Sequence, residues 1–403
     1  MPLETTTPLI NPGACKHHVV PEGVRAPSVR GVLRWWFRAL VGSYLDLPAL
    51  RALEGFTFGT AEERGVVSTA TRTVVTPKPK PKEFNQLRSP GVKYLLYSLR
   101  PTREDRRRRS IPQFVPPPLK FDVAFTFSRA TFEAKRNDWL GRHPGAFASD
   151  DQFQLNELRN LVRMAAFVWV HFGGVGSRTR RGAGRVALRE DVDGVDDATR
   201  KMFTPWKEDF TLDRFLSRRL KLFGNQLKKL FGERDRRTSP REPGHAVLSS
   251  GRFRAFVDPV GNGSWNAALE VLHERYAGED GFRFLRFDLS EESDEVRRAM
   301  GSRDRRVAFG LPVVFGDDRQ VSAYRGGDEW RRASPLWLGV VRWRGKYHPT
   351  VAVFGGQFLP RGVEIRDRDG PVEVDAELLL NDVVFRHLGE RMCPEWQRVE
   401  GLQ

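Results

Sequence analysis

Cysteine is scarce in this chain of 403 residues, which contains only Cys15 and Cys393. Two thiols exclude a disulfide scaffold and a Cys-rich zinc site, and they are typical of a reducing compartment. Long apolar runs are also missing, because the longest, Met164–Val170, is far too short to span a bilayer. The N-terminus lacks the basic and apolar segments of a secretory signal. We therefore expect a cytoplasmic protein without membrane association.

Acidic residues are outnumbered: 51 Asp and Glu face 67 Lys and Arg, a net charge of +16. Only 13 of the basic residues are lysines, so 54 are arginines. The guanidinium fork matches phosphate oxygens and stacks on bases, so this surplus indicates a polyanionic partner. A GC-rich genome is an alternative cause of the excess of Arg over Lys, although not of the net charge.

The length suits two domains, and a hydrophobic content of 39% is enough to build their cores. We predict an N-terminal domain over residues 1–190, a linker over 191–209 and a C-terminal domain over 210–403. The first domain alternates strands and helices, with expected strands at 3–10, 66–75, 92–99, 121–127 and 185–189 and helices at 28–41 and 155–172. Their order predicts an α+β, ferredoxin-like fold with insertions.

The second domain is expected to be another α+β unit of degenerate ferredoxin-like type. It begins with a basic amphipathic helix, whose apolar residues recur from Leu216 to Leu230. A shorter helix is expected at 265–276. Strands are expected at 252–258, 283–289, 307–315, 336–343 and 350–354.

The segment Arg25–Leu40 reads RAPSVRGVLRWWFRAL. On a helix, Arg30, Arg34 and Arg38 share one face. Ser28 is the expected N-cap, which puts Gly31 in the first turn, where free N–H groups bind anions. A candidate anion site therefore includes Arg25, Ser28, Arg30, Gly31, Arg34 and Arg38. The alternative is a solvated arginine face opposite a buried aromatic one.

The segment Gly173–Arg185 reads GGVGSRTRRGAGR. Glycine lets a backbone approach a phosphodiester closely, and arginines neutralise it. The segment follows a helix and precedes a strand, so it is no dinucleotide fingerprint, and the chain has no P-loop. The candidate RNA-binding residues here are Gly173, Gly174, Gly176, Arg178, Arg180 and Arg181. The alternative is a flexible hairpin.

The stretch Cys15-Lys16-His17-His18 offers a base, an acid and a cation. These are the groups that metal-free RNA cleavage requires, since the 2′-OH attacks the adjacent phosphate. The alternative is an exposed loop in which Lys16, His17 and His18 at most touch phosphate. Paired carboxylates elsewhere are scattered, so we expect no metal site, no cofactor and no catalytic residue of the two-metal type.

Together these motifs resemble the RAMP superfamily of CRISPR proteins. The Ser28–Gly31 segment is similar to its helix-opening motif, and Gly173–Arg185 is similar to its C-terminal Gly-rich loop. Among the subfamilies, the first RAMP subunit of the type III-B, or Cmr, effector complex matches best, also through Glu4–Pro8, Tyr94–Tyr97 and Arg331–Leu336.

This resemblance implies tandem ferredoxin-like domains in a tail subunit that holds CRISPR guide RNA and captures single-stranded target RNA, next to other Cmr-complex RAMP subunits. It implies a non-catalytic role, because in this family the aspartate that cuts target RNA belongs to a different RAMP subunit. The loop 11–27, which contains Glu22 as its only acid, agrees with that role. It gives Arg331 and Arg332 no role. Two other interpretations stay open, a metal-independent endoribonuclease using His17 or His18 and a solitary RNA chaperone.

Overall fold

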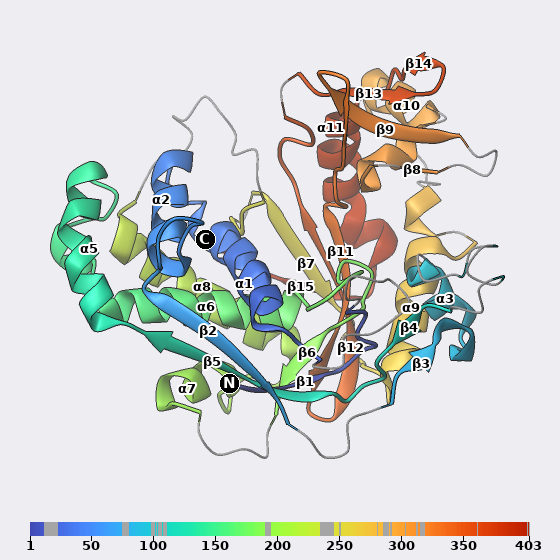
Figure 1. Ribbon diagram of the computed structural model, residues 1–403. Coiled ribbons are helices and arrows are strands. Elements are labelled where there is room, and N and C mark those ends of the chain that lie inside the picture. The colour runs from blue at the N-terminus through green and yellow to red at the C-terminus, as the bar shows by residue number, and fades with distance from the viewer. Residues whose placement is uncertain are drawn as a thin grey trace.

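The computed structural model shows two α+β units lying side by side (Figure 1). It describes the chain apart from residues 12–22, 75–79, 98–100, 102, 104–106, 108–110, 190–194, 234–245, 250, 280, 285–289, 291, 303, 312, 315–318, 361, 401 and 403. The described residues contain no helix long and apolar enough to cross a membrane.

The first unit is a four-stranded antiparallel sheet with two helices. Its elements follow the order β1 (Pro2–Thr5), α1 (Ala26–Val41), β2 (Val67–Thr73), β5 (Lys120–Phe127), α6 (Leu155–Phe172) and β6 (Val186–Leu188). The strands lie in the sheet as β2-β5-β1-β6, and every neighbouring pair is antiparallel. The first and third strands of the β-α-β-β-α-β series are therefore central, which confirms the predicted ferredoxin-like topology.

The second unit repeats this topology. Its series is β7 (Phe253–Val257), α9 (Trp265–Ala277), β11 (Leu336–Trp343), β12 (Lys346–Phe354), a helical segment formed by α11 (Ala376–Leu378), η7 (Leu379–Phe385) and η8 (Leu388–Met392), and β15 (Gln397–Val399). The sheet order β11-β12-β7-β15 is again antiparallel, with the first and third strands central. The expected second ferredoxin-like unit is thus present.

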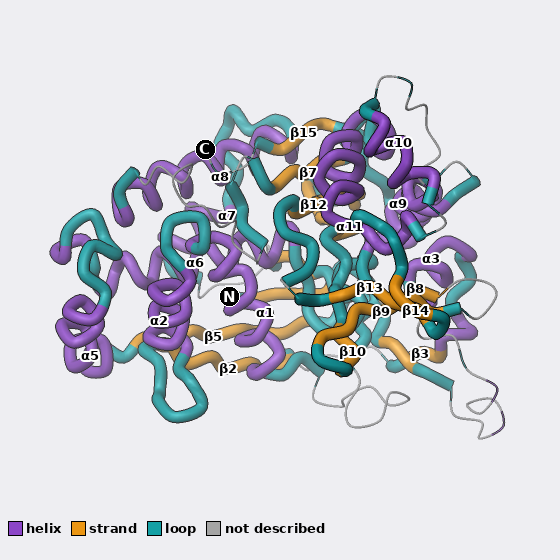
Figure 2. The backbone as a smooth tube through the Cα atoms, turned by 90° about the horizontal axis from the view of Figure 1, so that it is seen from above, coloured by secondary structure: helices purple, strands orange, loops and turns teal. Residues whose placement is uncertain are grey.

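Both β-α-β-β-α-β series contain inserted helices and strands (Figure 2). The first unit carries α2 (Leu47–Phe58), β3 (Lys82–Glu83), η1 (Phe84–Gln86), α3 (Pro90–Leu95), β4 (Gln113–Phe114), α5 (Arg129–Arg142) and η3 (Asp150–Gln152). Between the two series lie α7 (Asp197–Phe203) and α8 (Leu212–Phe231). The second unit carries η5 (Phe282–Phe284), α10 (Asp294–Gly301), η6 (Arg305–Phe309), β8 (Val313–Val314), β9 (Gln320–Arg325), β10 (Asp328–Trp330), β13 (Glu364–Asp367) and β14 (Gly370–Pro371).

The second sheet is buried on both faces, which explains the continuous apolar run of β11. Trp337 and Val341 face the core that contains α1, α6 and α8. Leu338 and Val340 face a second core with α9 and the 376–392 helical segment. The apolar stripe of α8 belongs to the first of these cores. The predicted division of the chain at 191–209 remains a prediction.

Three local predictions were wrong. Residues 90–95 form helix α3 rather than a strand, because the Ser89 hydroxyl accepts from the Val92 N–H at 3.1 Å and Pro90 suits a first turn. Helix α1 begins before Ser28, with Arg25 at the N-cap, so Gly31 lies in the second turn and has no free first-turn amide. The strand expected at 307–315 begins instead in the 3₁₀ helix η6, which includes residues 307–309, and only Val313–Val314 of this stretch form a strand among the described residues.

Two of the three arginines that share one face of α1 form ion pairs with helix α2. Arg34 Nε and Arg38 Nη1 lie 2.5 and 2.6 Å from the same carboxylate oxygen of Glu54, which is buried. Arg34 also donates to the Gly59 carbonyl at 3.0 Å. Ion pairs that satisfy a buried carboxylate are structural, so these two arginines join α1 to α2, while Arg30 stays exposed.

A glycine-rich segment, residues 173–185, links the two units and is called the Gly-rich loop below. The Arg180 carbonyl accepts from the Leu338 N–H of β11 at 3.1 Å, so the loop extends the edge of the second sheet. At the end of the loop Arg185 is fully buried and donates to the carbonyl of Gly173 and, at 3.4 Å, to the Thr350 hydroxyl. Burial lowers the pKa of Arg185 to about 9.

The Arg185 guanidinium lies directly against Gly339, so a Cβ atom there would overlap it. We expect Gly339→Ala to lower the free energy of unfolding by about 1–3 kcal/mol, the usual cost of overpacking a filled core. The measurement is urea denaturation. Gly263→Ala, whose added methyl group meets no atom within 4 Å, is the matched control.

Because the predicted clash is with one side chain, the two positions should be coupled. The double variant Arg185→Ala, Gly339→Ala should lose less free energy of unfolding than the sum of the losses in the two single variants. Equal unfolding midpoints for Gly339→Ala and Gly263→Ala would contradict this packing.

Candidate nucleic-acid interface

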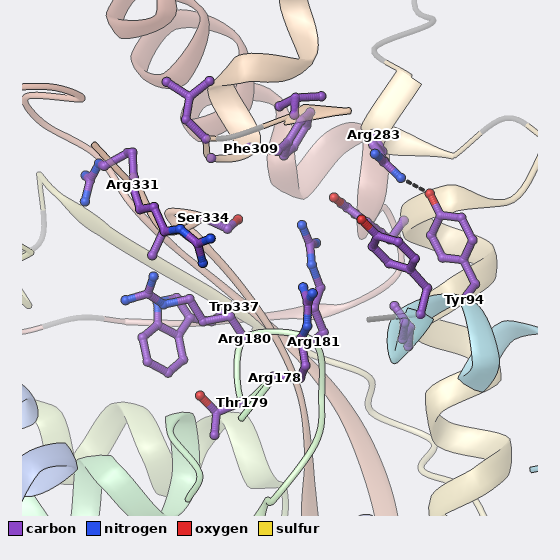
Figure 3. Close-up of a pocket in the computed structure, with 18 of the residues that line it drawn as sticks. Tyr94, Arg178, Thr179, Arg180, Arg181, Arg283, Phe309, Arg331, Ser334 and Trp337 are labelled. Atoms are coloured by element: carbon purple, nitrogen blue, oxygen red, sulfur yellow. Dashed lines mark hydrogen bonds between the residues drawn. The ribbon is translucent and has the colours of Figure 1, made fainter. Parts of the chain in front are cut away.

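A cavity of about 1890 Å³ lies between the two units. Figure 3 shows that the Gly-rich loop, the segment 331–337, helix α3 and the region around Phe309 contribute its walls. The loop comes from the first unit, and Phe309 and Trp337 come from the second. The cavity therefore exists only because the two ferredoxin-like units are packed together.

The cavity wall is strongly cationic. Eight lining residues carry a positive charge, and the described lining residues include no Asp, Glu, His or Cys. The cations are Lys93, Arg178, Arg180, Arg181, Arg283, Arg306, Arg331 and Arg332. Like charges gathered on one surface repel one another, so the cavity favours a polyanion.

The glycines of the Gly-rich loop are needed for internal packing. A Cβ at Gly174 would lie 2.8 Å from the Gly184 carbonyl oxygen, and the Cβ position at Gly173 meets Trp36 and Trp169. Gly176 has a φ of 87° and approaches the Ile10 carbonyl. Gly173 and Gly174 are buried and leave no surface for a phosphodiester. The glycines thus shape the turn, and the arginines between them reach the cavity.

Aromatic rings support the two loop arginines nearest β11. The Arg180 guanidinium lies 4.7 Å from the Trp337 ring centroid and 5.8 Å from that of Trp35, and Arg181 lies 4.6 Å from that of Tyr276. Such stacking holds each cation in place without neutralising it.

Burial lowers the pKa of Arg180 and of Arg332. Burial, followed by the charges of Arg332 and Arg181, lowers the pKa of Arg180 to about 10. Arg181 Nη1 and Arg332 Nε are buried, and no hydrogen-bond partner for them lies in the described part of the chain. These two nitrogen atoms are donors that an anion in the cavity can use.

Helix α3 forms the opposite wall. The Arg283 guanidinium donates to the Tyr94 hydroxyl (Figure 3), and burial together with the Arg283 charge lowers the pKa of Arg306. Tyr97 lies just after this helix, and its ring centroid is 5.6 Å from the guanidinium of Arg178 in the Gly-rich loop.

The structure brings only part of the predicted site together. Arg178, Arg180, Arg181 and Gly31 line the cavity. Arg25 and Arg30 are exposed and Ser28 is half-buried, all in the first turns of α1 and outside the lining. Lys16, His17 and His18 lie outside the described residues.

Several lining residues were missed by sequence reasoning. Arg283 and Arg306 are single arginines in a chain rich in them, with no local motif to mark them. Thr179, Ser334 and Trp337 likewise carry no signal of their own. Arg331 and Arg332 were noted in the sequence without a role, and the structure places both in the cavity wall. No cluster of three or more metal-ligating side chains occurs among the residues that the structure describes.

Comparisons with known proteins agree with this architecture. Residues 3–187 match the RAMP superfamily. The chain is 27% identical over 351 residues to the CRISPR system Cmr subunit Cmr1-1 of Pyrococcus furiosus, which covers 86% of this chain and 83% of that protein. It is 28% identical over 199 residues to Cmr1-2 of the same organism, covering 46% of this chain and 92% of the relative.

Two solved structures share the fold. The apo crystal structure of Cmr1 from Pyrococcus furiosus matches with a TM-score of 0.57 at 23% identity, over 100% of this chain and 98% of that one. A chain in the cryo-EM structure of a type III-B Cmr-beta complex bound to cognate target RNA and AMPPnP matches with a TM-score of 0.52 at 12% identity, over 96% and 98%. Residues 3–187 therefore match the RAMP superfamily, and most of the chain is similar to the Cmr1 subunits of CRISPR Cmr systems.

Proposed function

We propose that this chain is a non-catalytic RNA-binding subunit of a type III-B CRISPR ribonucleoprotein that acts in the cytoplasm in antiviral defence. The observation that carries the proposal is the cavity with eight cations and no carboxylate among its described lining residues. Its relatives are named as Cmr subunits, and one structure with the same fold belongs to a complex bound to target RNA. The ligand is guide RNA, target RNA or both, and the partners are other Cmr-complex RAMP subunits.

The chemistry of the cavity suits phosphate contacts better than base reading. Guanidinium groups donate to phosphate oxygens and position a strand without specifying its sequence. In a guided complex, base pairing between two RNA strands carries the sequence information. We therefore assign Arg178, Arg180, Arg181, Arg331 and Arg332 to the sugar-phosphate backbone of bound RNA.

The described lining of the cavity suits RNA binding better than RNA cleavage. Its described lining residues include no histidine and no carboxylate to act as a general base at neutral pH. The arginines are poor bases, because even Arg180 keeps a pKa of about 10. A role in holding RNA follows more directly from this wall than a role in cutting it.

Replacing Arg180 and Arg332 by glutamine should weaken RNA binding by about tenfold or more, because charge-assisted hydrogen bonds to phosphate are lost. The slope of log affinity against log salt should fall by about 0.7 for each phosphate contact removed. Fluorescence anisotropy with single-stranded RNA at several salt concentrations measures both.

The matched control is the pair Arg366→Gln and Arg368→Gln, which removes the same charge from exposed positions outside the cavity. The cavity variant should stay folded, because no carboxylate of the described chain forms a salt bridge with Arg180 or Arg332. Equal salt slopes for the two variants would remove the cavity from the binding site.

Bound RNA should stay intact. We expect no cleavage when the protein is incubated with RNA in EDTA and the RNA is resolved by electrophoresis. Cleavage that disappears in His17→Ala or His18→Ala would contradict the non-catalytic role and favour the endoribonuclease.

Purification from the native host should recover the chain with other RAMP proteins and with short RNAs that share a repeat-derived end. Sequencing of the RNA and mass spectrometry of the proteins test this. Recovery of mixed cellular RNA without protein partners would instead favour a solitary RNA chaperone.

A further inference from the structure

Tyr97 differs from the other aromatic residues of the cavity in its exposure. It is 58% exposed, whereas Trp337, Tyr276 and Phe309, which line the same cavity, are buried and packed in the cores. A buried ring supports the wall, but an exposed ring leaves part of its surface to solvent. Of the cavity residues the structure describes, Tyr97 is thus the aromatic side chain best placed to meet a ligand.

Arg178 is held over Tyr97 in spite of an unfavourable backbone conformation. Its φ is 61°, a left-handed value that residues with a Cβ adopt at an energetic cost. This conformation belongs to the turn in which the Arg178 carbonyl accepts from the Arg181 N–H at 2.8 Å. The turn directs the guanidinium toward the ring of Tyr97, at 5.6 Å from its centroid. Two planar groups from distant segments therefore meet at the cavity wall.

We propose that Tyr97 and Arg178 form a stacking site for an unpaired base of single-stranded RNA. This inference rests on the proposed RNA-binding function and extends it, because it names the form of RNA that the cavity accepts. Aromatic rings and guanidinium planes are the surfaces on which proteins stack splayed-out bases. In an A-form duplex neighbouring base pairs cover the base faces, so a double strand cannot use such a site.

The two sides of the cavity then have separate tasks. The arginines near β11, Arg180 and Arg332, take phosphates, and the Tyr97 side takes a base. Stacking tolerates any sequence, because every base has a π face. Because the tyrosine ring is uncharged and neutralises no phosphate, its contribution to RNA affinity should be independent of salt, unlike that of the arginines.

The test uses the full-length protein and a fluorescein-labelled oligouridylate in anisotropy titrations. Tyr97→Ala should weaken binding by about tenfold, the typical loss for one stacked base, and Tyr97→Phe should retain most of the affinity. The salt slope should match that of the wild type. Phe210→Ala, which removes a 66% exposed ring outside the cavity lining, is the matched control and should bind normally.

A second ligand makes the test independent of folding effects. An oligomer of the same length without bases should bind the wild type more weakly than oligouridylate does, and Tyr97→Ala should cause no further loss with it. Tyr97→Ala that binds oligouridylate like the wild type, or that loses equal affinity for both ligands, would overturn the stacking site.

The two proposals fail in different ways. Absence of RNA binding by the wild type, or an unchanged salt slope when Arg180 and Arg332 are replaced, would overturn the proposed function itself. Normal behaviour of the arginine variants together with an unaffected Tyr97→Ala would overturn only the stacking of a base.

Discussion

The contact between the Gly-rich loop and strand β11 decides how the two ferredoxin-like units lie against each other. The Arg185 guanidinium fills the space left by the missing side chain of Gly339, and the Arg180 carbonyl accepts from Leu338. The backbone hydrogen bond and the close packing of the Arg185 side chain against Gly339 leave little room for one unit to shift along the other. The cavity lies beside this contact, and its loop arginines belong to the same chain segment.

That contact brings positively charged side chains close together, and their repulsion is unfavourable when no ligand is bound. Arg180, Arg181 and Arg332 lie close enough for the charges of Arg181 and Arg332 to lower the pKa of Arg180, yet the described lining offers no carboxylate to relieve the repulsion. Unrelieved repulsion of this kind is typical of a binding site, because the ligand supplies the missing charge. A polyanion that enters the cavity therefore stabilises the arrangement that binds it.

Arginines that look alike in the sequence have different roles in the structure. The helical spacing of Arg30, Arg34 and Arg38 predicts one cationic face, and that face exists. Its second and third members are nonetheless joined to Glu54, which belongs to another helix that spacing cannot bring near. The glycines of the Gly-rich loop predict points of close phosphate approach, yet the chain's own atoms occupy the space beside Gly173 and Gly174.

The sequence by itself determined the β-α-β-β-α-β order of the first unit, because alternation along β5 and three- and four-residue periodicity along α6 are local properties of burial. In the second unit it predicted β7, α9, β11 and β12, but not the 376–392 helical segment or β15. It also marked Arg178, Arg180 and Arg181, which share one motif. Only the tertiary structure decided that Arg283, Arg306, Arg332 and Tyr97 meet them around one cavity. The physical reason is that local patterns record which side of an element is buried, whereas convergence depends on the packing of distant segments.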